Sequence, residues 1–341
     1  MSSPTQTTPS YAQISLPPKT SPPSAKHHLI YFITGNPGVI GLYDNFLNTL
    51  HTLISDSPTT SPESDIFSVY GRSLAGFEPA TTFSSTDTQR TPYTLEEVIE
   101  VSLNSLESLR ISDGPRKGQP FDNVILIGHS LGTWMALEIV QRLRKRSSPI
   151  KIRAAILLFA TVTHIAKSPN GLRFTRLFKI PGFAKRVSTA AKTLVDLTPT
   201  RTLRWLVGVF ARMPDEAAGK ITRYLKSRMG IWQTFSLADE EMKQISEDRW
   251  DEEVWGVENK GLETTDQAPK LIFYFGKEDR WVSSETRDVL IAARGQSDTD
   301  SGSKPVMIVD KVDIPHDFCI RHSEIIAEKV AVWVGDIVGT K

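Results

Sequence analysis

A serine between two glycines is the first place in the sequence where residue types and spacing could support chemistry. The pentapeptide GHSLG at residues 128–132 fits the pattern G-x-S-x-G, in which the serine attacks a carbonyl carbon. A continuous apolar run at residues 124–127 precedes it, and an amphipathic run at residues 134–143 follows it. Strand, sharp turn and helix form the setting that such a nucleophile requires. We therefore expect Ser130 to be the nucleophile of an acyl transfer.

The residues beside Ser130 suit this turn. A strained backbone at the nucleophile needs small residues two positions away on each side, and Gly128 and Gly132 provide them. The helix that starts behind Ser130 points free N–H groups at the reacting centre, so the N–H of Leu131 is an expected oxyanion donor. The alternative is an ordinary strand–helix turn bounded by glycines.

A second oxyanion donor is expected in the glycine-rich stretch TGNPG at residues 34–38, which follows the first central strand. Pro37 has no N–H, so Asn36 is the candidate. A tight turn that needs a positive φ would explain the same glycines without a chemical role.

A serine hydroxyl becomes a good nucleophile only when a base removes its proton, and that base is oriented by an acid. The apolar run at residues 271–275 is followed by Glu278 and Asp279. A carboxylate just past the end of a parallel strand lies at the same edge of the sheet as the serine. Asp279 is the expected acid and Glu278 the alternative. Without Ser130, both would be interpreted as charges in a surface turn.

His316 is the expected base. It follows the last strand-like run, at residues 306–309, and precedes the helical run at residues 323–334. His322 falls at the start of that helix and is the weaker candidate. His129 is adjacent to Ser130 in sequence but points away from it at such a turn, so we reject it as the base.

The elements that must position these residues are strands separated by helical segments. Strand-like runs, nearly continuous in Val, Ile, Leu and Phe at the centre, occur at residues 28–33, 66–70, 124–127, 153–159, 270–275 and 305–309. Continuous apolar strands are typical of a parallel sheet that is covered by helices on both faces. The fold class is therefore α/β, and the order serine, acid, histidine is that of the α/β-hydrolase fold.

One connection is much longer than a crossover helix needs. The 109 residues from 161 to 269 separate two consecutive strands. They contain four tryptophans, at 205, 232, 250 and 255, which favours a folded insertion over a disordered one. We expect a helical cap over residues 163–268, inserted before the penultimate strand, within one hydrolase domain over residues 27–341. The Ser-, Thr- and Pro-rich residues 1–26 are expected to form a loose tail, with a short strand at residues 11–16 as an alternative.

Composition excludes several classes of protein. A net charge of +1 over 341 residues argues against nucleic-acid binding. Cys319 is the single cysteine, so no intrachain disulfide forms, which fits a reducing compartment. The N-terminus lacks the pattern of a secretory signal, and no apolar run reaches the 18–20 or so residues of a membrane span. No metal-binding or dinucleotide motif is found, so we expect no cofactor and no metal.

Basic and acidic residues are concentrated in different parts of the cap sequence. Residues 171–213 contain nine basic residues and one acidic residue, whereas residues 237–259 contain nine acidic and two basic residues. Within the basic segment, Leu203, Leu206, Val207 and Phe210 share one helical face, which is typical of a helix that lies on an anionic lipid surface. Two alternatives remain: the helix packs on the core, or the two charged segments pair with each other.

Five blocks of the sequence together resemble the lipid-droplet-associated serine hydrolases. The resemblance rests on TGNPGVIGLYDNFL, VILIGHSLGTWMALEIVQRL, AILLFATVTHIAKSPNG, LIFYFGKEDRWV and IPHDFCIRHSEIIAEKVAVWV. It implies a triad of Ser130, Asp279 and His316, lipid ester substrates such as sterol esters or other neutral lipids, and peripheral residence on lipid droplets and the cytosolic face of the endoplasmic reticulum. The rival hypotheses are a droplet-surface scaffold with weak or no turnover, and a lipid acyltransferase or thioesterase that uses the same triad.

Overall fold

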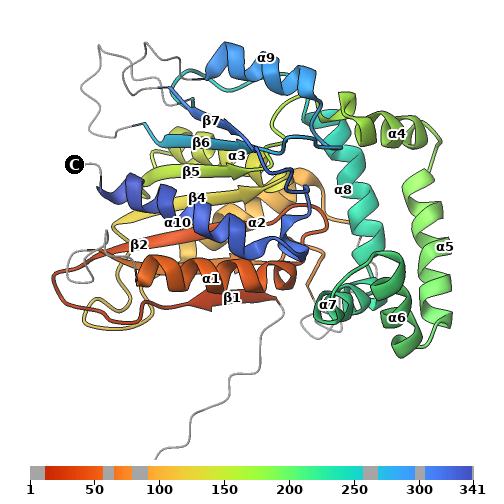
Figure 1. The fold of residues 1–341 in the computed structure, drawn as a ribbon, viewed down its shortest axis with the longest axis horizontal. Helices are drawn as coiled ribbons and strands as arrows, with labels where there is room; N and C mark the ends of the chain where they lie inside the picture. Colours follow the sequence, from red (N-terminus) through yellow and green to blue (C-terminus); the bar gives the residue numbers. More distant parts are fainter. Residues whose placement is uncertain (1–11, 57–64, 79–90, 256–267, 296–303, 340–341) are drawn as a thin grey trace, which may run out of the picture.

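A seven-stranded sheet in the order β1-β3-β2-β4-β5-β6-β7 forms the centre of the computed structural model (Figure 1). The structure describes residues 12–56, 65–78, 91–255, 268–295 and 304–339. β1 is antiparallel to β3, and the other neighbouring strands are parallel. The strands are β1 (Gln13–Leu16), β2 (Lys26–Ile33), β3 (Asp65–Arg72), β4 (Asn123–His129), β5 (Ile152–Leu158), β6 (Lys270–Phe275) and β7 (Val306–Val309).

The central strands are apolar on both faces because each face is covered by helices. In β2, Leu29 and Tyr31 face one hydrophobic core while Ile30 and Phe32 face the other. The first core packs against α2 (Leu95–Ser108), α3 (Leu131–Lys145) and α9 (Ser284–Arg294). The second packs against α1 (Asp44–Ser55) and α10 (Ser323–Gly339). The predicted α/β class with a mostly parallel sheet is confirmed.

The N-terminal tail predicted over residues 1–26 is too long. Residues 13–16 form β1, which pairs with β3 in register from Gln13 opposite Arg72 to Leu16 opposite Val69. Ile14 and Leu16 alternate along β1 and pack against the second core. This short alternation outweighs the surrounding Ser, Thr and Pro content, as the alternative prediction of a strand anticipated; residue 11 lies outside the described residues.

The long insertion between β5 and β6 is a helical cap. It contains the short helix η3 (Ile165–Lys167) and five longer helices, α4 (Pro169–Phe178), α5 (Phe183–Leu197), α6 (Thr200–Phe210), α7 (Asp215–Lys226) and α8 (Gly230–Gln244). Figure 1 shows these helices grouped at one end of the sheet. The two ends of the cap meet, because the N–H groups of His164 and Ile165 donate to the carbonyls of Ser246 and Ile245. Among the described residues, none of the helices is long and apolar enough to cross a bilayer.

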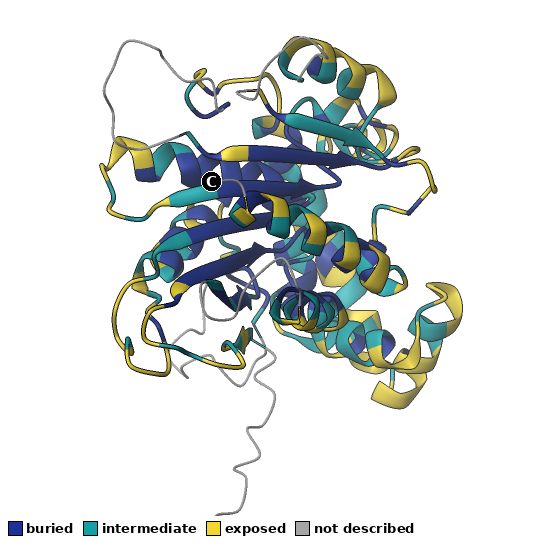
Figure 2. Cartoon of the chain, turned by 60° about the vertical axis from the view of Figure 1, so that its left-hand side comes forward, coloured by how far each residue is buried: buried dark blue, intermediate teal, exposed yellow. Residues whose placement is uncertain are grey.

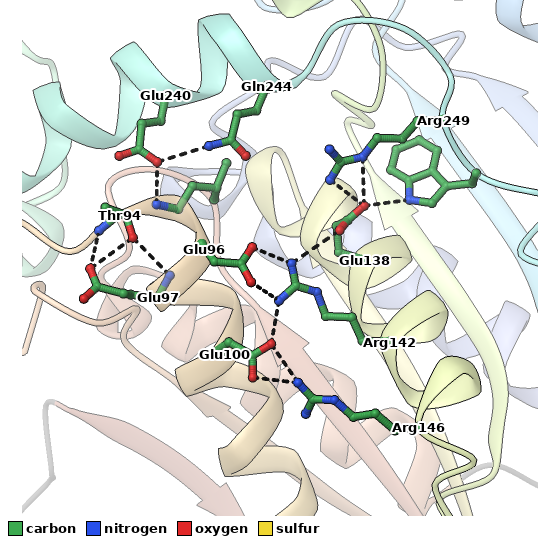
Figure 3. Close-up of polar contacts among 12 residues, drawn as sticks. Thr94, Glu96, Glu97, Glu100, Glu138, Arg142, Arg146, Glu240, Gln244 and Arg249 are labelled. Atoms are coloured by element: carbon green, nitrogen blue, oxygen red, sulfur yellow. Dashed lines mark hydrogen bonds and ion pairs between the residues drawn. The ribbon is translucent and has the colours of Figure 1, made fainter.

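The segment that returns from the cap is fixed to the helices below it. The buried carboxylate of Glu138 in α3 accepts hydrogen bonds from Arg249 Nε and Trp250 Nε1, which follow α8 (Figure 3). Arg142 in α3 lies near the same carboxylate and pairs with Glu100 of α2 at 2.6 Å. The base of the cap therefore rests on a continuous polar network that joins α2, α3 and the residues after α8.

Candidate active site

Ser130 lies in the sharp turn between β4 and α3. Its backbone has φ 53° and ψ −123°, a positive φ that non-glycine residues rarely adopt. A Cβ on Gly128 would lie 2.3 Å from the carbonyl oxygen of Gly132, and one on Gly132 would lie 2.2 Å from that of Ile33. The turn closes only because both positions are glycine, as the sequence pattern predicts for a nucleophile elbow.

Three predicted residues from distant parts of the chain meet at this turn. His316 Nε2 lies 2.8 Å from Ser130 Oγ, and His316 Nδ1 lies 2.7 Å from Asp279 Oδ2. Because an ionised carboxylate only accepts, Nδ1 carries the proton and Nε2 accepts the serine O–H. The Asp279 side chain is 2% exposed, and its other oxygen accepts the N–H of Trp281 at 2.7 Å. Glu278 is exposed and is not part of this chain of hydrogen bonds.

The turn that carries His316 is held by a buried carboxylate at the end of β7. Asp310 accepts the N–H of Ile314 at 3.0 Å and that of Lys311 at 2.9 Å. Burial alone would raise the pKa of Asp310, but hydrogen bonds, the one from Ile314 foremost, outweigh it and lower this pKa. Asp310 is therefore an ionised clamp that fixes the backbone two residues before His316.

His129, beside the nucleophile, links the loops of the site from behind. Its Nε2 lies 2.9 Å from the carbonyl oxygen of His316, and its Nδ1 lies 2.7 Å from Tyr43 Oη. The carbonyl only accepts, so Nε2 carries the proton and Tyr43 donates to Nδ1; the Tyr43 oxygen in turn accepts the N–H of Gly35 at 3.3 Å. Burial, and then the nearby His316, lower the pKa of His129 well below its usual value. A neutral His129 thus joins the loop after β2 to the loop after β7.

The two expected oxyanion donors lie on either side of the nucleophile. Leu131 is the first residue of α3, where backbone N–H groups have no partner within the helix. Gly35, next to Asn36, passes so close that a Cβ there would lie 2.9 Å from Ser130 Cβ. Among the hydrogen bonds of the described residues, none uses the backbone N–H of Leu131 or of Asn36. Both groups remain free to bind an anion.

From the sequence, Tyr43 is expected only to line the pocket, a few residues after the glycine-rich turn, and Glu241 is not singled out. Tyr43 is 3% exposed and braces His129, as described above, and Glu241 in α8 accepts a hydrogen bond from the Asn36 side chain at 2.7 Å. Glu241 could have been recognised from the sequence, because it follows Leu237 and Ala238, both buried, by four and three residues and so lies on their face of the helix. An acidic residue at a core-facing position of an amphipathic helix requires a polar partner.

The apolar stripe predicted in the cap does not face solvent as a whole. Leu203 is 7% exposed and packs inward, and Leu206 and Val207 are half-buried, whereas Phe210 is 81% exposed. Helix α6 packs against α7, and Leu203 is the buried side chain of α6. Contact of Leu203, Leu206, Val207 and Phe210 with lipid stays a prediction, and Phe210 is the most exposed of the four side chains.

A different set of apolar side chains is exposed on the cap. Figure 2 shows exposed residues gathered on its outer helices. In α6, Trp205 is 63% exposed and Val209 is 51% exposed; these two and Arg201 are spaced four residues apart and share one side of the helix. Helices α4 and α5 and the loop that joins them also carry exposed large apolar residues, namely Leu172, Leu177, Ile180, Leu194 and Leu197.

The predicted pairing between the two charged cap segments is not observed among the described residues. The acidic segment pairs with residues outside the basic one: Asp248 and Glu252 with Arg294, and Glu253 with Arg144. In the basic segment, Lys192 pairs with Asp196 and Arg204 with Asp215. The remaining basic side chains of α4–α6 are exposed.

Sequence comparison identifies relatives over nearly the whole chain. A family model described as lipid-droplet associated hydrolase matches residues 26–319. The chain is 26% identical to the lipid droplet-associated hydrolase of Drosophila melanogaster, over 91% of this chain and 88% of that protein. It is also 26% identical to the mouse protein of the same name, over 92% of this chain and 86% of that protein.

Solved structures share the fold. A mutant of a meta-cleavage product hydrolase superposes with a TM-score of 0.52 at 14% identity, over 95% of this chain and 94% of that one. Juvenile hormone epoxide hydrolase from the silkworm Bombyx mori gives 0.50 at 13% identity, over 96% and 73%. These neighbours are α/β-hydrolases, and the predicted α/β-hydrolase fold with a cap before the penultimate strand is confirmed.

Proposed function

Because this chain belongs to the lipid droplet-associated hydrolase family, we propose that it is a serine hydrolase that cleaves lipid esters, such as sterol esters or other neutral lipids, at lipid droplets. The observation that carries the proposal is the continuous chain of hydrogen bonds from Ser130 through His316 to Asp279. It starts from a serine at a strained turn, where the hydroxyl of a nucleophile is presented to its substrate.

In this mechanism Ser130 Oγ attacks the ester carbonyl carbon as His316 Nε2 takes its proton. Asp279 holds the Nδ1 proton and stabilises the imidazolium. The carbonyl oxygen becomes an oxyanion, which the free N–H groups of Leu131 and Asn36 bind; one such donor is worth about 10²–10³ in kcat. His316 then protonates the leaving alcohol, and an acyl-serine remains. Water, deprotonated by His316, releases the fatty acid and restores the serine.

Labelling by a fluorophosphonate probe tests the nucleophile. Ser130→Ala should abolish labelling and leave the fold intact, since only one hydroxyl is lost.

Asp279→Asn should lower turnover by a factor on the order of 10⁴, as in comparable triads, because the histidine loses its orienting carboxylate. Glu278→Gln is the matched control, one residue away and exposed, and should retain activity.

Two outcomes would contradict the assignment. Labelling of Ser130→Ala would place the nucleophile elsewhere, and loss of activity in Glu278→Gln but not in Asp279→Asn would transfer the role of the acid. A folded wild-type protein that does not label at all would support the scaffold hypothesis instead. Product analysis with water and an alcohol as competing acceptors separates a hydrolase from an acyltransferase.

We further propose that the outer cap helices α4–α6 dock the protein on phospholipid, either the droplet monolayer or the cytosolic face of the endoplasmic reticulum. The support is the combination of exposed apolar side chains, such as Trp205 and Phe210, with exposed basic ones, such as Arg201 and Arg212. Apolar side chains enter the interface while basic ones attract anionic headgroups, each contributing about 1 kcal/mol near the surface. Binding to anionic vesicles that weakens with salt is the expected signature.

A further inference from the structure

We infer that Glu241, in cap helix α8, is a positioning residue for the loop that presents the Asn36 N–H to the oxyanion. The inference rests on the proposed hydrolase function and adds to it a role for the cap in turnover. Glu241 lies in the inserted cap, whereas Asn36 follows β2 in the central sheet. The hydrogen bond of 2.7 Å between their side chains therefore joins the cap to the catalytic edge of the sheet.

The hydrogen-bond roles at Asn36 are determined by its second partner. The same side-chain atom that lies 2.7 Å from Glu241 Oε1 lies 3.1 Å from the carbonyl oxygen of Thr234. A backbone carbonyl only accepts, so this atom is the amide nitrogen, Nδ2. Glu241 must therefore offer an accepting oxygen, which both its ionised and its protonated form possess. The Asn36 amide is held by two acceptors of α8, from residues about two turns apart.

Glu241 has little reason to be buried other than this contact. The residue is 5% exposed, and among the described residues Asn36 is the one hydrogen-bond partner of its side chain. Burial raises the pKa of Glu241 to about 7, and the hydrogen bond from Asn36 opposes that rise. Burial of a carboxyl group costs free energy that a leucine at the same position of the helix would not cost. The hydrogen bond to the loop of Asn36 explains why a carboxyl group is buried at this position.

Helix α8 is a firm support because other contacts fix it to the hydrolase domain. Gln233 accepts the N–H of Tyr93 at 2.7 Å and donates to its carbonyl at 2.9 Å. Glu240 accepts the N–H of Leu95, at the start of α2, at 2.7 Å. Asn36 is thus attached to an element that is anchored independently of Asn36. A site held this way keeps its geometry, whereas a displacement of about 1 Å can cost on the order of 10²-fold in rate.

The test measures kcat and KM for a small soluble ester in matched variants. Glu241→Leu should lower kcat by about 10–100-fold, the range expected for a displaced oxyanion donor, with KM little changed. Glu241→Gln should keep most of the wild-type kcat, because its amide oxygen accepts the same hydrogen bond. Lys243→Ala is the control: it removes a side-chain ion pair of the same helix, with Asp239, but, within the part of the chain that the structure describes, no hydrogen bond or ion pair with Asn36 or the hydrolase domain, and should leave kcat near the wild-type value.

A double-mutant cycle with Asn36→Ala makes the inference specific to this contact. If Glu241 acts through the Asn36 side chain, Glu241→Leu should have little further effect in the Asn36→Ala background. If Glu241→Leu does not fold, Asn36→Ala alone tests the same bond and should lower kcat by a similar factor.

The inference would be overturned by a wild-type kcat in Glu241→Leu, by an equal loss in Glu241→Gln or in Lys243→Ala, or by additive effects in the cycle. These outcomes presuppose a wild-type enzyme that labels at Ser130. Failure of the proposed function itself is distinct, because the wild-type protein would then not label.

Discussion

At the scale of single residues, buried polar side chains lie behind Ser130, the proposed nucleophile, and are connected to the residues proposed to react with it. Tyr43 and His129 form one hydrogen-bonded chain with defined proton positions, which ends on the backbone of His316. Because His129 stays neutral, it adds no charge beside His316 while fixing where that residue sits. The base is thereby oriented through its backbone as well as through Asp279.

Removal of the Tyr43 hydroxyl tests this brace. In Tyr43→Phe, the N–H of Gly35 loses its acceptor and His129 Nδ1 loses its donor, both in the interior. Leaving buried groups unsatisfied costs about 1–3 kcal/mol, so the free energy of unfolding in urea should fall by that amount, and kcat should fall with it. Tyr70→Phe is the control, because within the described ranges the Tyr70 hydroxyl bonds only Gln13, at the edge of the sheet. An equal loss in both variants would argue against a special role for Tyr43.

Glu241 makes the stability of the protein depend on pH. Its pKa, about 7 in the folded chain against an ordinary 4.5, means that the folded state keeps a proton that the unfolded state releases between these values. Its contribution is therefore fully present below about pH 4.5 and declines as pH rises to 7, by about 3 kcal/mol in total. The variant Glu241→Gln has no titrating group at this position and so lacks this pH-dependent contribution to the free energy of unfolding. The loss of unfolding free energy from pH 5 to pH 8, measured by urea denaturation, should be smaller in the variant; an identical loss would place this titration elsewhere.

At the scale of elements, the strands were predictable because burial on both faces leaves a continuous apolar run. The runs around Ile127 and Phe273 each became a central strand at the expected place, and the serine, acid and histidine after the strands were brought together. A strand that ends at a turn places its next residue at a known edge of the sheet. Local pattern was therefore sufficient for these residues.

The cap was predictable as an insertion but not in its orientation. Leu203 and Phe210 look alike in sequence, yet the first is buried and the second is exposed. Periodicity shows that a helix has an apolar face, but not which neighbour covers it. The pairing of Glu241 with Asn36, 205 residues apart, is likewise a product of tertiary packing, and local spacing carries no information about it.

The two sides of α6 should respond differently to truncation. Leu203→Ala removes a buried side chain and should lower the free energy of unfolding by about 2 kcal/mol, the low end for such a change. Trp205→Ala removes an exposed one and should change it by less than about 0.5 kcal/mol. Urea denaturation followed by circular dichroism measures both. If Trp205→Ala proves the more destabilising, α6 faces the other way.

At the scale of the whole molecule, the cap has two faces with different tasks. Its outer helices α4–α6 carry the exposed apolar and basic side chains, whereas α8 lies against the hydrolase domain and reaches Asn36 (Figure 1). The net charge of the chain is only +1, so attraction to an anionic surface must come from this local excess rather than from the molecule as a whole.

Vesicle binding tests the outer face. Binding to vesicles of phosphatidylcholine and phosphatidylserine should weaken as salt rises from about 0.1 M to about 1 M, because the Debye length falls from about 10 Å to about 3 Å. Trp205→Ser with Phe210→Ser should release the protein and leave hydrolysis of a soluble ester unchanged. Val289→Ser with Val332→Ser, equally exposed but on α9 and α10, should bind as the wild type does. Retained binding in the first pair, or lost binding in the second, would move the docking surface elsewhere.

The meeting of the two ends of the cap at His164–Ser246 and Ile165–Ile245 has a consequence for how such enzymes diverge. Because the insertion leaves and rejoins the sheet at one place, recombination between related genes can exchange it as a block without disturbing the strands. The block includes α8, and with it the carboxyl group that holds Asn36. A transplanted cap therefore brings its own hydrogen-bond partner for Asn36.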